Sequence, residues 1–163
     1  MTRSLRHLAP VLAGVAAMVA AGPSTAAVKR MVTYDSASPQ ARQLTGAGLT
    51  FVFTKSLMRQ RVLAVRATAV AVGVIPEPLR DSDTIRALDG LMGEDAGIGT
   101  LYAIDPDKAE GKVMIQAFCP GSTQGWLAIS PIAHNRDLRV HAFGADAAGQ
   151  SRLCAVMDFT WRG

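Results

Sequence analysis

Residues 138–161 read LRVHAFGADAAGQSRLCAVMDFTW, and this stretch decides the fold. Among its first six residues, the set Leu138/Val140/Ala142 alternates with the set Arg139/His141/Phe143. This two-residue period is typical of a β-strand with two different faces. A second run rich in β-forming residues covers 153–161, and the glycine-containing segment 144–150 between the two runs is typical of a hairpin loop. The stretch therefore predicts a pair of antiparallel strands.

Further strands are predicted wherever β-branched and aromatic residues are concentrated. These runs lie at 28–34, 49–53, 61–74, 100–104 and 126–129. The run at 61–74 has apolar residues at both odd-numbered and even-numbered positions, so they do not all lie on one face of a regular strand. As a single strand it would be covered on both faces or would contain a bulge at 66–69.

Two short helices are predicted from their start signals. Ser38 followed by Pro39 is typical of a helix N-cap and its first residue. Asp81 or Ser82 is a good N-cap for a second helix, which the apolar spacing extends to Met92. The first helix is expected to stop at Gly46, which makes it about two turns long.

Segment 106–118 fits both helical spacing and strand alternation, and the opening Asp105-Pro106 favours the helix. The order of elements predicts an α+β fold: a single layer-type domain with a largely antiparallel sheet and two or three short helices packed against one face. The domain is expected to cover 28–163.

The first 27 residues form a predicted signal peptide. Arg3 and Arg6 precede an apolar run from Leu8 to Ala21, and small residues follow at 22–27. About 14 apolar residues span roughly 21 Å as a helix, less than a hydrocarbon core of about 30 Å. Arginine outnumbers lysine 13 to 4, a bias that we attribute to a GC-rich bacterial genome. We expect a cleaved leader, a periplasmic or secreted protein, and no transmembrane segment in the mature chain.

The charged residues are unevenly distributed. Segment 28–66 has seven basic residues and one acidic residue, whereas 67–110 has nine acidic residues and three basic ones. We expect the two segments to neutralise each other in the fold, and the alternative is a basic surface that binds an acidic partner. Nucleic acid is not an expected partner, because the net charge is only +4 and few aromatic residues lie among the basic ones.

The only two cysteines, Cys119 and Cys154, predict one disulfide, since an even number of cysteines in an exported domain is typical of structural pairing. A reactive thiol at Cys119 is the alternative. It would need a base within reach, and the chain has no C-x-x-C motif.

Three further residues are weak catalytic candidates: Ser122, His134 and His141. No G-x-S-x-G motif surrounds a serine, and the histidine spacing does not gather enough ligands for a metal, so neither a metal nor a cofactor is predicted. The sequence favours a non-catalytic binding or envelope-associated protein, stabilised by one disulfide, whose partner is an envelope protein or a small ligand. The alternative is a small periplasmic hydrolase or thiol enzyme that uses the Cys119–Ser122 turn with His134 or His141.

Overall fold

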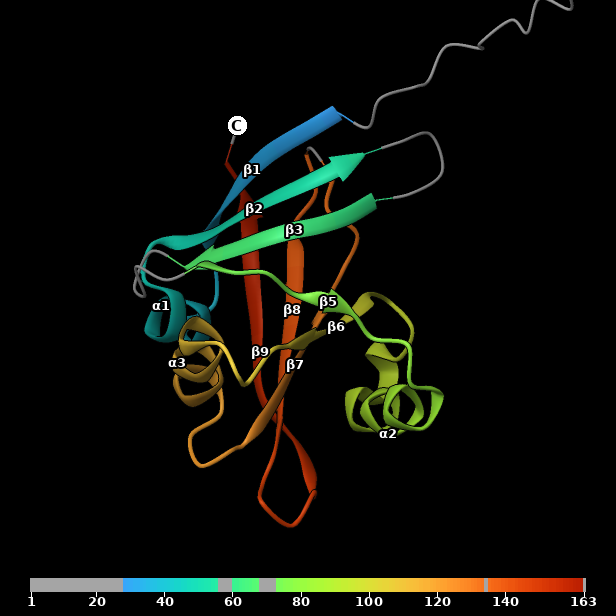
Figure 1. The fold of residues 1–163 in the computed structure, drawn as a ribbon. Coiled ribbons are helices and arrows are strands. Elements are labelled where there is room, and N and C mark those ends of the chain that lie inside the picture. The colour runs from blue at the N-terminus through green and yellow to red at the C-terminus, as the bar shows by residue number, and fades with distance from the viewer. Residues whose placement is uncertain (1–27, 56–59, 68–72, 134, 163) are drawn as a thin grey trace, which may run out of the picture.

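One antiparallel sheet organises the part of the chain that the computed structural model describes, which is 28–55, 60–67, 73–133 and 135–162 (Figure 1). The predicted signal peptide and His134 lie outside the described residues. The nine strands are β1 (Val28–Ser36), β2 (Gly48–Lys55), β3 (Gln60–Ala67), β4 (Gly73–Val74), β5 (Glu77–Pro78), β6 (Thr100–Ile104), β7 (Gln124–Ile129), β8 (Leu138–Ala145) and β9 (Ser151–Trp161). Their order across the sheet is β4-β3-β2-β1-β9-β8-β7-β6-β5.

The sheet curves so strongly that its two halves share one core. The larger group of buried apolar residues takes Phe51 and Val65 from β2 and β3, and Leu127 and Met157 from β7 and β9. Figure 1 shows β1, β2 and β3 crossing over the strands of the other half. The two edge strands, β4 and β5, are separated by only two residues along the chain. The result is an α+β fold dominated by the sheet, with three helices in its described part.

The helices cover both faces of the sheet: α1 (Pro39–Thr45) and α3 (Ala109–Phe118) on one, α2 (Ser82–Met92) on the other. Neighbouring residues of β7 show the division. Leu127 packs in the core with α1 and α3, whereas Trp126 packs with Leu88 and Met92 of α2. The prediction that all helices pack against one face was therefore wrong, because both faces of β7 are apolar and each needs a cover.

The predicted helix starts are confirmed. Ser38 Oγ accepts a hydrogen bond from the Ala41 N–H at 3.1 Å, and Pro39 is the first residue of α1. Asp81 Oδ2 accepts from the Thr84 N–H at 2.8 Å at the start of α2. The ambiguous segment is helical, as its Asp-Pro opening favoured, and forms α3.

The prediction of one strand over 61–74 was wrong. Val65 pairs with Val74 and Arg66 with Gly73 in antiparallel register, so the chain reverses direction between β3 and β4. A register shift does occur in β3, where Leu63 is the extra residue opposite Val52 and Phe53 of β2. Residues 68 and 69 of the predicted bulge lie outside the described residues. Within β3 this shift lies between Val62 and Val65, so both are buried although one is even-numbered and the other odd-numbered.

The C-terminal hairpin is confirmed, and a bulge within it positions the disulfide. Ala142 pairs with Ala155 and Phe143 with Leu153, which leaves Cys154 as the extra residue of β9. Cys154 is joined to Cys119, the C-cap residue that follows α3. Their Cα atoms are 5.3 Å apart, inside the usual range of about 4.4–6.8 Å. None of the helices in the described ranges is long and apolar enough to cross a membrane.

Candidate functional site

The residues that the sequence suggested for catalysis do not form one site. Ser122 is buried, and its hydroxyl lies 3.1 Å from Cys119 Sγ. A side chain at Gly144 would collide with both of these groups, so this glycine lets the Cys119–Ser122 turn pack directly on β8. His141 lies three residues earlier on β8 and packs beside Phe143 on the opposite, α2-covered face. The structure therefore does not bring Ser122 and His141 together, and both sulfurs are in the disulfide.

His141 belongs instead to a compact charged cluster, formed by Asp95, Arg139, His141 and Asp158, at the polar end of the α2-covered face. The 3₁₀ turn that follows α2, η1 (Gly93–Asp95), supplies Asp95. Asp95 Oδ2 lies 3.0 Å from His141 Nε2 and 3.0 Å from Arg139 Nη1. Arg139 Nε donates to Asp158 Oδ1 at 2.7 Å. Because an ionised carboxylate only accepts hydrogen bonds, His141 donates its Nε2 proton to Asp95.

The electrostatics of this cluster indicate a structural role. The hydrogen bond from Arg139 holds the pKa of Asp95 below its ordinary value; partial burial opposes this shift and the bond from His141 adds to it. The bond to Asp158 raises the pKa of Arg139 in turn. The adjoining cavity measures only about 10 Å³, room for about one water molecule. A second cavity, of about 330 Å³, is lined by Arg139 and Asp158, but these two charged side chains are already paired with each other. The cluster therefore anchors η1 to β8 and β9 with its charges neutralised.

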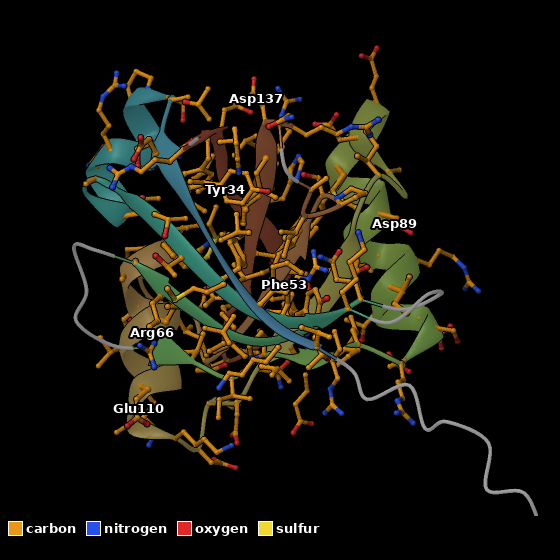
Figure 2. The ribbon with its side chains drawn as sticks, turned by 90° about the horizontal axis from the view of Figure 1, so that it is seen from above. Tyr34, Phe53, Arg66, Asp89, Glu110 and Asp137 are labelled. Atoms are coloured by element: carbon orange, nitrogen blue, oxygen red, sulfur yellow. A yellow bond between two sulfur atoms is a disulfide. The ribbon has the colours of Figure 1, made fainter. Side chains whose placement is uncertain are left out.

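A larger cavity, which we call the basic cavity, lies under the start of β1. It measures about 270 Å³ and is lined by Arg30, Val32, Phe53, Lys55, Ile132 and Ala133. The antiparallel register places Arg30 opposite Phe53 and Val28 opposite Lys55, so alternate residues of β1 and β2 face the same side. Figure 2, which looks onto β1–β3, shows Phe53 close to the start of β1.

Two hydrogen bonds hold the 132–133 segment over this part of the sheet. The Tyr34 hydroxyl donates to the Ala133 carbonyl at 3.0 Å, and Gln60 Nε2 donates to the Ile132 carbonyl at 3.1 Å. Burial raises the pKa of Tyr34, so this hydroxyl keeps its proton at neutral pH. Buried Val32, Phe53 and Ile132 supply the apolar lining, and the exposed side chains of Arg30 and Lys55 supply the charge.

The cations of this cavity have no acidic partner within the described ranges. The acids of 67–110 that form ion pairs do so with Arg86, Lys108, Arg139 and His141, and Asp35 pairs with Arg162. None of these pairs joins the basic segment 28–66 to the acidic segment 67–110. Among the described residues, no direct ion pair therefore neutralises one segment with the other. The signal for this site in the sequence is the excess of basic residues in 28–66, for which charge balance within the fold is the other interpretation.

The described residues contain no group of three or more histidine, cysteine, aspartate or glutamate side chains arranged to hold a metal ion. Comparisons with protein-family models, with curated proteins and with solved structures find no match to this chain. The function of the chain is therefore inferred from the geometry of the basic cavity.

Proposed function

We propose that this chain is an exported, non-catalytic binding protein that recognises an acidic group, carried by a small ligand or by an envelope partner, in the basic cavity. One observation carries the proposal: Arg30 and Lys55 lie at an apolar cavity of about 270 Å³ and pair with no carboxylate of the described chain. A ligand with a carboxylate and a short apolar body matches both features. Export is supported by the predicted leader, and the disulfide is compatible with an oxidising compartment.

The affinity for a small acid should be modest. An exposed ion pair contributes about 0.2–1 kcal/mol, and burial of apolar area adds about 25 cal/mol per Å². A cavity slightly below the range of about 300–1,000 Å³ that is typical of drug-sized ligands can bury only a short apolar group. These terms together point to a dissociation constant on the order of 1 mM, which corresponds to a free energy of binding of about 4 kcal/mol.

Hexanoate, with hexanol as the uncharged control, tests the site by ligand-observed NMR. We expect hexanoate to bind and hexanol not to bind at the same concentration. In an Arg30→Glu/Lys55→Glu variant the hexanoate signal should disappear. The matched control is Arg80→Glu/Lys112→Glu, which changes the net charge equally at exposed residues outside the cavity. Equal binding by both variants would contradict the proposed site.

Export is tested separately by intact-mass analysis of the protein recovered from the periplasm or the medium. We expect a mature N-terminus at Ala27 or Val28, just where β1 begins. A mass that retains residues 1–26 would mean that the leader is an uncleaved anchor. Protein found only in the cytoplasm would contradict export.

A further inference from the structure

The strand that borders the basic cavity has one unpaired edge. β1 pairs with β2 along nearly its whole length, from Val28 to Asp35. On its other side it pairs with β9 only from Tyr34 to Ser36, and the Arg162 N–H extends this contact to the Thr33 carbonyl at 3.4 Å. Within the described residues, nothing pairs with the 28–32 portion of β1 on that side.

The direction of the backbone hydrogen-bonding groups alternates along β1, and this identifies the groups that face the open edge. The Ser36 N–H bonds to the Ala47 carbonyl on the β2 side, whereas the Ala37 N–H bonds to the Asp158 carbonyl on the β9 side. Thr33, also odd-numbered, is bonded on the β9 side. Because hydrogen-bonding direction alternates along a strand, the N–H and C=O groups of Lys29 and Met31 point to the open edge.

The open edge belongs to the same strand portion that lines the basic cavity. Arg30 and Val32 line the cavity, and Met31, which lies between them, is 69% exposed on the other face of the strand. Lys29, on the same face of the strand as Met31, is a third exposed cation that has no acidic partner in the described chain. Unpaired backbone groups therefore lie beside unpaired positive charge and an apolar cavity.

We propose that an extended, acidic segment of a partner protein adds as a further strand to the 28–32 edge of β1 and places a carboxylate at Arg30 and Lys55. In this mode of recognition, main-chain hydrogen bonds supply affinity and side-chain pockets supply specificity. The positive charges also keep two copies of this edge from pairing with each other, so they select an acidic partner over a second copy of the chain. The inference rests on the proposed function and names the chemistry of the partner.

The test uses the full chain and a fluorescent peptide of sequence Thr-Val-Glu-Val-Thr, acetylated and amidated at its ends, with Gln in place of Glu as the charge control. Two further versions of the peptide carry N-methyl groups on alternate residues: one version on the odd-numbered positions of the peptide and the other on the even-numbered positions. A peptide that is added as a strand presents only one parity of N–H groups to β1. We expect one methylated version to bind about tenfold more weakly and the other to bind nearly as well as the parent.

Met31 provides the matched variants on the protein side. Met31→Pro removes the N–H at the open edge without removing a bond to β2, and proline is tolerated on an edge strand. Met31→Ala removes the side chain and keeps the N–H. We expect the proline variant to bind the peptide about tenfold more weakly and the alanine variant to bind within a factor of about three. The methylated peptides test the same bond without any change to the protein.

The outcomes separate the two proposals. Charge-dependent binding that neither N-methylation nor Met31→Pro weakens would overturn strand addition and leave the basic cavity as the site. If neither the peptide nor hexanoate binds, the proposed function is overturned. Binding to anionic lipid vesicles at 0.15 M salt, with no binding of the peptide, would overturn the protein-segment partner in favour of a membrane surface.

Discussion

Arg139 and Arg30 are arginines of the same sheet with opposite surroundings. Arg139 bonds to two carboxylates, Asp95 and Asp158, and lines cavities of about 10 and 330 Å³. Arg30 has no acidic partner in the described chain and lies at a cavity of about 270 Å³ with an apolar lining. Arg139 is neutralised by carboxylates of the chain and serves the fold, whereas Arg30 is unpaired in the described chain and lies beside an apolar cavity, so it is available to a ligand. The charged cluster is therefore assigned to stability and the basic cavity to binding.

The largest effect on stability is expected from the disulfide. Cys119→Ala or Cys154→Ala should lower the free energy of unfolding by roughly 2–4 kcal/mol, because the bond closes a loop of 35 residues that becomes free in the unfolded chain. Denaturant unfolding measures this loss, and the double variant should be no less stable than either single one. Hexanoate binding should survive in conditions where the variants remain folded. A cysteine variant that loses binding while keeping its stability would contradict a purely structural bond.

A smaller, pH-dependent effect is expected from Asp95→Asn. The folded-state pKa of Asp95 is depressed, so its ionised form contributes stability above its ordinary pKa of about 3.8, and this contribution is lost as the pH falls through the lower folded value. The variant should therefore be less stable than the parent at pH 7, and the difference should shrink as the pH approaches 3. Urea unfolding at a series of pH values measures it. A difference that grows on acidification would contradict this assignment.

The smallest effect on stability is expected at the basic cavity. Arg30→Glu/Lys55→Glu should change the free energy of unfolding by less than about 0.5 kcal/mol, since both side chains are exposed and neither is paired within the described residues. The same variant should lose hexanoate and peptide binding. A large loss of stability would show that these cations hold the fold together, as Arg139 does, and would erase the contrast between the two regions.

Local signals in the sequence predicted the elements well. Ser38-Pro39 and Asp81 mark helix starts because a side-chain oxygen at the N-cap satisfies a backbone N–H within the next three residues, which is a local contact. The β8–β9 hairpin and the disulfide also follow from short-range patterns and from the number of cysteines. These features need no knowledge of distant partners.

Long-range features could not be predicted in the same way. The apolar face of α2 indicates that it is buried but not on which side of the sheet, although the continuous burial of β7 and β8 fits two covered faces. The basic cavity depends on Tyr34 and Gln60 holding a segment that lies 99 and 72 residues further along the chain. The basic excess in 28–66 was visible, but whether it is neutralised depends on the fold.

The most direct test of the central claim is a titration of the isotope-labelled full chain with hexanoate, followed by the backbone amide resonances of both regions. The account predicts saturable shifts at Arg30, Val32 and Phe53, with a dissociation constant on the order of 1 mM. It also predicts unchanged resonances at Asp95 and His141. Shifts confined to the charged cluster, or no saturable shift at the basic cavity, would contradict the assignment of binding to the unpaired cations.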